Sequence, residues 1–154
     1  MKQLMILFVA FLFILSFQLS GQTKADSLAV EKACRDYVEG WAEGNVERVA
    51  SGVSPELTKR TVSQDKDGIS FTNDMSASLL LLVTKRNKDG IRSTDLEPDK
   101  PFKLDVYIYD ITADYALAKT VNTKYGFFDY CQLAKIDGNW KVINVLWGWL
   151  PQKK

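Results

Sequence analysis

The final third of the chain carries its strongest structural signal, a predicted β-hairpin. Two runs rich in β-branched and aromatic residues, Gly126 to Ile136 and Trp140 to Trp149, flank the turn sequence Asp137-Gly138-Asn139. An Asp-Gly pair between two such runs is typical of a hairpin with a tight turn. Both arms carry apolar side chains on both faces, which excludes a sheet with one face in water. We therefore expect a helix or a partner chain to cover the second face.

Helical patterns dominate the first half of the chain. The stretch from Thr23 to Glu43 has an apolar stripe with helical spacing, and Gly44 is expected to end this helix. A second helix is expected to begin at Asn45, and a short one at Ser54-Pro55-Glu56, where a capping serine precedes a proline in the first helical position. The predicted inward positions are Val30, Cys34, Tyr37 and Trp41 in the first helix and Val46, Val49, Ala50 and Val53 in the second, with Glu47 and Arg48 outward.

Strands dominate the second half of the chain. Helices first and a four-strand antiparallel meander last predict an α+β domain in which helices lie across a curved sheet. The elements expected between the first helices and the hairpin are strands at Arg60 to Gln64 and Ile69 to Thr72, a helix from Met75 to about Lys85 capped by Asn73-Asp74, an exposed connection from Asn87 to Pro101, and strands at Phe102 to Ile111 and Tyr115 to Thr123.

The start of the chain predicts a secretory signal peptide. Lys2 is followed by an unbroken apolar run from Leu4 to Leu15 and then by small or polar residues through Gly21. The run is shorter than the roughly 20 residues that span a bilayer. We therefore predict a signal peptide at residues 1–21, a single domain at residues 22–154, and a periplasmic or secreted protein with no membrane attachment after cleavage.

Composition excludes several classes of function. The formal net charge is +1 and no run of like charge occurs, so no nucleic-acid partner is expected. The chain has no histidine, which excludes Ser-His and Cys-His nucleophiles and histidine-ligated metal sites. Acid-base chemistry would have to come from a carboxylate, a tyrosine or a lysine. No metal and no cofactor is expected.

The order of elements and three stretches of sequence carry a family resemblance. These stretches run from Tyr37 to Asn45, from Leu57 to Arg60 and from Asp129 to Trp147. They resemble the nuclear-transport-factor-2-like superfamily of cone-shaped α+β domains, and within it the exported bacterial branch classed as lumazine-binding, a neighbour of the SnoaL-like polyketide cyclases. One departure is Ser54-Pro55-Glu56, where the family commonly has His-Pro-Asp, so any role of that histidine is lost.

The resemblance implies a pocket between the first helix and the concave side of the sheet. An aromatic-lined pocket of this kind suits a small apolar or aromatic ligand. The alternative is that the same aromatic residues simply pack the core. The outward face of the hairpin, with Phe128, Tyr130, Gln132, Trp140 and Val142, would form a homodimer through the sheet. The implied ligand-binding residues are Tyr37, Trp41, Phe127, Asp129, Trp147 and Trp149.

Tyr37 and Asp129 are the candidate catalytic residues. They occupy places similar to the tyrosine and protonated aspartic acid of ketosteroid isomerases in the same superfamily. An aspartic acid on an apolar wall has a raised pKa and can donate a hydrogen bond. The isomerases also need a carboxylate base, but the segment from Leu57 to Val62 contains no acid, and we expect Lys59 and Arg60 there to form a solvated edge.

Three functions therefore stay open. The favoured one is a non-catalytic, exported small-molecule-binding domain. The second is a cofactor-independent isomerase, cyclase or dehydratase that uses Tyr37 and Asp129. The third is a structural or interaction module whose core is filled by side chains.

The two cysteines, Cys34 and Cys131, are far apart in the sequence. They are either buried thiols or, outside the cytoplasm, a disulfide. The faces that the resemblance implies place both thiols inside the cone, where a disulfide would join the first helix to the sheet.

Overall fold

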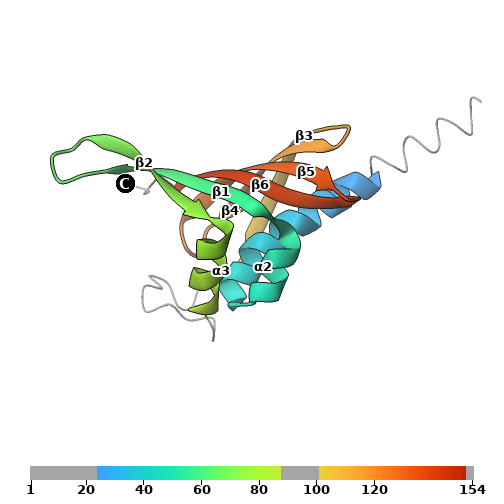
Figure 1. Cartoon of the computed structure of the whole chain (residues 1–154), viewed down its shortest axis with the longest axis horizontal. Helices are drawn as coiled ribbons and strands as arrows, with labels where there is room; N and C mark the ends of the chain where they lie inside the picture. The colour runs from blue at the N-terminus through green and yellow to red at the C-terminus, as the bar shows by residue number, and fades with distance from the viewer. Residues whose placement is uncertain (1–23, 88–100, 152–154) are drawn as a thin grey trace, which may run out of the picture.

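The computed structural model describes residues 24–87 and 101–151, which form helices packed on a mixed six-stranded sheet (Figure 1). This is the predicted α+β architecture. An N-terminal helix at residues 24–43 comes first. It is followed by α2 (Val46–Gly52), β1 (Val53–Gln64), β2 (Ser70–Ser76), α3 (Ala77–Lys85), β3 (Leu104–Thr112), β4 (Tyr115–Asn122), β5 (Phe127–Ile136) and β6 (Asn139–Trp149).

The sheet has the strand order β2-β1-β6-β5-β4-β3. Its last four strands form the expected antiparallel meander, and Gly138 turns the terminal hairpin with a φ of 76°. β1 pairs in parallel with β6 and antiparallel with β2, which adds two strands to the meander. β6 is therefore a central strand with neighbours on both sides.

The N-terminal helix lies across one face of the sheet and closes the core (Figure 1). Its predicted stripe is buried, with exposed fractions of 0% for Val30 and Cys34 and 2% for Tyr37. Burial of each apolar side chain of valine size or larger contributes about 1.5–3 kcal/mol. Gly44, with a φ of 72°, ends the helix, and the Asn45 side chain then accepts a 2.9 Å hydrogen bond from the Arg48 N–H. Both boundary predictions are confirmed.

α2 departs from its predicted faces at two positions. Ala50 is exposed rather than inward. Arg48, predicted to face outward, is only 26% exposed and pairs with three acidic side chains of the N-terminal helix: Asp36 at 3.3 Å, Glu43 at 2.6 Å, and Glu39. These ion pairs join the two helices.

A β-bulge in β6 overturns one predicted face. Gln132 pairs with Asn144 and Leu133 with Val142, so Ile143 has no partner in β5. An extra residue shifts the alternation of side chains by one position. Trp140 and Val142, predicted on the outer face, are therefore buried on the same face as Trp147, with exposed fractions of 5% and 0%.

The predicted short helix at Ser54-Pro55-Glu56 is wrong, because these residues lie in β1. The pairing of β1 with β6 shifts register between Val53 and Thr58, and proline is tolerated at such irregularities because it has no N–H to give to the ladder. Ser54 still makes a local hydrogen bond of the capping kind, because its Oγ accepts from the Glu56 N–H at 3.2 Å, but no helix follows. Beyond the irregularity, Leu57 and Lys59 both face inward.

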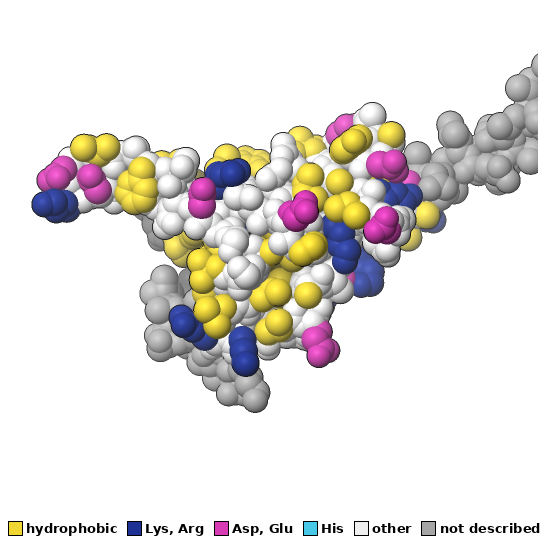
Figure 2. Space-filling model, viewed as in Figure 1, with side chains coloured by type: hydrophobic (Ala, Val, Ile, Leu, Met, Phe, Trp, Pro, Cys, Tyr) yellow, Lys and Arg dark blue, Asp and Glu magenta, His cyan; other side chains and the backbone are white. Residues whose placement is uncertain are grey.

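The helix predicted from Met75 begins later than expected. Asn73, Asp74 and Met75 belong to β2, and Ser76 is the cap, its Oγ accepting from the Leu79 N–H at 3.3 Å. The two short strands predicted around Lys66-Asp67-Gly68 are confirmed as parts of β1 and β2. Their hairpin extends away from the rest of the molecule (Figure 1) and carries hydrophobic side chains on its surface (Figure 2).

The predicted signal peptide and most of the predicted connection from Asn87 to Pro101 lie outside the described residues. Within residues 24–87 and 101–151, no helix has the length and apolar character needed to cross a membrane.

Candidate functional site

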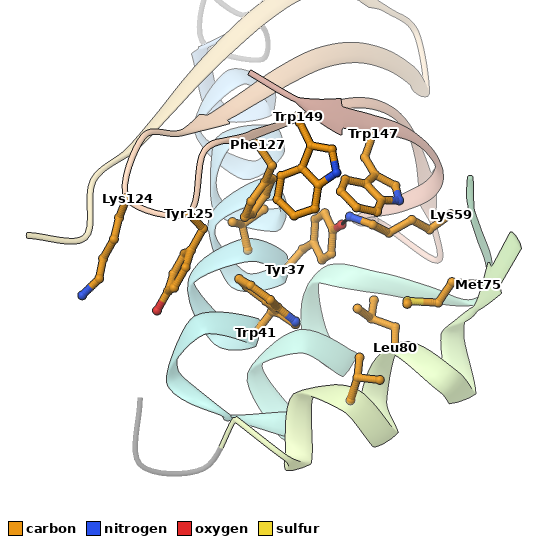
Figure 3. Close-up of a pocket in the computed structure, with 12 residues that line it drawn as sticks. Tyr37, Trp41, Lys59, Met75, Leu80, Lys124, Tyr125, Phe127, Trp147 and Trp149 are labelled. Atoms are coloured by element: carbon orange, nitrogen blue, oxygen red, sulfur yellow. Dashed lines mark hydrogen bonds between the residues drawn. The ribbon is translucent and has the colours of Figure 1, made fainter. Parts of the chain in front are cut away.

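A cavity of about 470 Å³ lies between the helices and the sheet. The N-terminal helix, the β1–β2–α3 segment and the strands β5 and β6 all contribute to its walls (Figure 3). Its volume falls in the range of roughly 300–1,000 Å³ that is usual for small-molecule sites. The cavity is lined by Tyr37, Val38, Trp41, Lys59, Met75, Leu80, Val83, Lys124, Tyr125, Phe127, Trp147 and Trp149.

Aromatic rings form much of the wall and hold one another in place. Trp41 packs edge-to-face against Phe127, with ring centroids 5.6 Å apart, and against Tyr125 at 5.4 Å. Trp147 and Trp149 form a similar pair at 5.1 Å. Edge-to-face pairs of this kind contribute about 0.5–1.5 kcal/mol beyond the area they bury. These ring pairs therefore stabilise the positions of the side chains that form the wall.

The structure brings together all six residues that were predicted to bind a ligand. Five of them line the cavity, including Trp149, which is 67% exposed (Figure 3). The sixth, Asp129, is fully buried behind the wall and contacts the cavity residue Tyr37. Tyr37 and Asp129 face one another as predicted, because the Tyr37 hydroxyl donates a 3.3 Å hydrogen bond to the Asp129 carboxylate.

Lys59 is one of the cavity residues that were not predicted from the sequence. Instead of forming a solvated edge, Lys59 is buried, and its side chain enters the cavity wall from β1. Its Nζ donates to the Tyr37 hydroxyl at 2.5 Å and to Asp129 Oδ1 at 2.6 Å. In a strand, Leu57 and Lys59 lie on the same face, so an inward Leu57 predicts an inward Lys59. This prediction was not made, because a helix was expected at Ser54-Pro55-Glu56. Arg60, the next residue, does lie on the exposed side, 3.3 Å from Asp74.

Asp129 accepts hydrogen bonds from three donors. Its Oδ1 accepts from Lys59 and Tyr37, and its Oδ2 accepts from the Thr120 hydroxyl at 3.2 Å. A fully buried carboxylate is tolerated only when it is paired and hydrogen-bonded in this way. In these three hydrogen bonds Asp129 is the acceptor, and the donor role that the resemblance implies for it stays a prediction.

The Tyr37 hydroxyl stays protonated at neutral pH. Burial, and next the negative charge of Asp129, raise the pKa of Tyr37 well above its usual range. Tyr37 therefore serves as a neutral hydrogen-bonding group between the lysine and the aspartate.

Three aromatic rings surround the Lys59 ammonium group. Its Nζ lies 5.0 Å from the ring centre of Trp147, 5.2 Å from that of Tyr37 and 5.8 Å from that of Phe127. A cation within about 6 Å of an aromatic face is attracted to the ring. The polar end of the cavity is thus the Lys59 ammonium group, which binds Asp129 and Tyr37 and lies beside aromatic rings. Figure 3 shows Lys59 next to Tyr37 and Trp147.

Cys34 and Cys131 are both free and fully buried, one on the N-terminal helix and the other on β5. A hydrogen bond between the two thiols, together with burial, raises the pKa of Cys131 well above its usual range. The thiols therefore lie next to one another as expected, and the disulfide between them stays a prediction for the oxidised protein.

The described part of the chain holds no group of three or more histidine, cysteine, aspartate or glutamate side chains that could bind a metal ion. The candidate site is therefore defined by its aromatic wall and by the cluster of Lys59, Asp129 and Tyr37.

Comparison with known families matches residues 25–148 to the family described as "Putative lumazine-binding". No curated protein matches the sequence.

Several solved structures share the fold. An NTF-2-like protein of unknown function from Silicibacter pomeroyi is 13% identical with a TM-score of 0.62, over 82% of this chain and 98% of that chain. An NTF2-like protein of unknown function from Shewanella baltica is 18% identical with a TM-score of 0.54, over 83% and 96%. A structure described as a putative scytalone dehydratase from Novosphingobium aromaticivorans is 12% identical with a TM-score of 0.54, over 86% and 89%. At these identities the likeness shows a nuclear-transport-factor-2-like fold.

Proposed function

The chain belongs to the family described as "Putative lumazine-binding", and we propose that it is an exported protein that binds a small, flat aromatic or apolar molecule without transforming it. The observation that carries this proposal is the cavity of about 470 Å³, whose wall includes six aromatic side chains and Lys59, which forms a polar cluster with Tyr37 and Asp129. Small-molecule sites typically combine an apolar wall with a few polar groups that orient the ligand. The cavity also argues against a module whose core is filled by side chains.

The polar cluster favours binding over catalysis. A general base must be available to take a proton, but the Asp129 carboxylate already accepts hydrogen bonds from Lys59, Tyr37 and Thr120. Asp129 is also shielded from the cavity, because it is fully buried and does not line it. The segment after α2 contributes Lys59 to the cavity, whereas the ketosteroid isomerases need a carboxylate base from this segment.

A cofactor-independent isomerase, cyclase or dehydratase is the second candidate function. The hydrogen bond between Tyr37 and Asp129 favours it, because these are the two residues that such a reaction would use. Turnover of a ketosteroid that disappears in the Asp129→Asn variant, while the variant remains folded, would establish this function in place of the first.

Tryptophan fluorescence tests the binding function. Three of the four tryptophans line the cavity, so lumazine, riboflavin or a steroid that enters it is expected to change the emission and to reach saturation. Trp147→Phe should reduce the response, whereas Trp140→Phe should leave it intact, because Trp140 is buried away from the cavity against Asp26. Flat titrations with every member of an apolar and aromatic ligand panel would contradict the proposal.

A further inference from the structure

The ammonium group of Lys59 has one N–H for which the described residues offer no acceptor. An ammonium group has three donors. Two of them go to the Tyr37 hydroxyl and to Asp129 Oδ1, and no acceptor for the third is found among residues 24–87 and 101–151. Lys59 also lines the cavity, whereas Asp129 lies behind it. The remaining donor is therefore available to a molecule in the cavity.

The charge of this lysine is already balanced. The Lys59 and Asp129 side chains form an ion pair 2.6 Å long in which both partners are buried. A carboxylate or phosphate ligand at Lys59 would place two negative charges beside this one ammonium group, because Lys124, the other lysine of the lining, points away from Lys59 (Figure 3). Buried charge without full compensation is strongly unfavourable. A neutral acceptor avoids this cost, because the cluster then keeps a net charge of zero.

The surrounding rings favour a flat ligand at the same point. The faces of Tyr37, Phe127 and Trp147 lie within 5.8 Å of the Lys59 Nζ, so a group that reaches the nitrogen passes between aromatic surfaces. Flat rings pack well against such surfaces.

We propose that Lys59 selects the ligand by donating its third N–H to an uncharged acceptor, a carbonyl oxygen or a ring nitrogen, on the buried edge of a flat aromatic molecule. This inference rests on the proposed binding function and adds the chemical class of the ligand. Lys59 is the specificity-determining residue, and the Tyr37 hydroxyl and the Asp129 carboxylate hold it in position.

Three matched probes test this selection by isothermal titration calorimetry. Acetylnaphthalene carries a neutral carbonyl acceptor, ethylnaphthalene has nearly the same shape without an acceptor, and naphthoate is an anion. A hydrogen bond from a charged donor is worth about a tenfold change in affinity or more. We expect acetylnaphthalene to bind about tenfold more tightly than either of the other two.

Variants assign the preference to the lysine. Lys59→Met alone would leave the Asp129 carboxylate buried without its cation, so the informative variant is Lys59→Met with Asp129→Asn, which removes both charges. In this double variant acetylnaphthalene and ethylnaphthalene should bind equally well. The control is Lys66→Met, at an exposed lysine in the turn between β1 and β2, which should keep the tenfold preference.

The outcomes distinguish failure of the proposed role of Lys59 from failure of the proposed binding function. Equal binding of acetylnaphthalene and ethylnaphthalene to the natural chain, or tighter binding of naphthoate, overturns the role of Lys59 and leaves the binding function standing. Retention of the preference in the double variant also overturns it. Failure of all three probes to bind overturns the inference together with the proposed function.

Discussion

At the scale of single residues, the buried ion pair between Lys59 and Asp129 is the main polar feature of an apolar interior. The Asp129 side chain is fully buried and the Lys59 side chain is 11% exposed. A pair of this kind adds little net stability compared with apolar residues, but loss of one partner leaves an uncompensated charge. The pair therefore makes the two positions dependent on each other.

This dependence predicts a strongly non-additive mutant cycle. Lys59→Met should lower the free energy of unfolding by about 3–5 kcal/mol, because it strands the buried carboxylate. Combining it with Asp129→Asn should recover part of that loss, so that the double variant costs much less than the sum of the single variants. Urea unfolding at neutral pH measures all three, with Lys66→Met as the exposed control. Additive effects would show that the two side chains do not form an ion pair in solution.

Some contacts of these residues could be predicted from the sequence and others could not. The contact between Tyr37 and Asp129 could be predicted from the family resemblance, which places the helical stripe against the strand face that carries Asp129. Lys59 could not be predicted, because the local capping pattern at Ser54-Pro55-Glu56 favoured a helix, and only the pairing of β1 with β6 makes that segment a strand. Tertiary pairing outweighed the local signal.

At the scale of elements, the terminal hairpin and the N-terminal helix were predictable because their signals are local. The Asp137-Gly138 turn and the Gly44 stop each depend on a few neighbouring residues. The bulge at Ile143 has no comparable local signal, since nothing in a run of apolar residues marks which one lacks a partner. The faces of Trp140 and Val142 were therefore assigned wrongly, while those of Trp147 and Trp149 were assigned correctly.

The contact between the N-terminal helix and β5 leads to a prediction about the cysteines. We expect Cys34 and Cys131 to form a disulfide in an oxidising compartment, because their thiols already contact one another. The bond should raise the free energy of unfolding by about 2–4 kcal/mol by restricting the unfolded chain. Intact mass spectrometry without reductant should show the loss of a pair of hydrogen atoms, and Cys34→Ser should abolish that loss.

Treatment with a mild oxidant, followed by a count of the remaining free thiols, can contradict this prediction. If both thiols of the folded protein stay free even after prolonged exposure to the oxidant, the predicted bridge does not form. The raised pKa of Cys131 makes a slow reaction the expected one, because only the thiolate attacks.

At the scale of the whole molecule, no helix within residues 24–87 and 101–151 covers the outer face of the sheet (Figure 1). A row across this face places Lys119, Tyr130, Leu146 and Arg60 side by side on four neighbouring strands. Tyr130 is 40% exposed and Leu146 52% exposed. We propose that two copies of the chain form a homodimer through this face. Trp140 and Val142 do not take part, because the bulge places their side chains in the core.

The dimer can be tested by sedimentation velocity. The natural chain should sediment as a dimer, and Leu146→Lys should shift it to the monomer, because a like-charged row would then meet its copy. Leu28→Lys, on the exposed side of the N-terminal helix, is the matched control and should leave the dimer intact. A natural chain that sediments as a monomer over the concentrations studied would remove this proposal and leave the cavity unaffected.

The most direct test of the whole account is calorimetry of lumazine with two matched variants of α3. Val83 lines the cavity, so Val83→Trp should fill part of it and abolish the heat of binding. Leu82, its neighbour, is 48% exposed and does not line the cavity, so Leu82→Trp should bind lumazine as the natural chain does. Undiminished binding by a folded Val83→Trp variant would place the ligand elsewhere and contradict the account.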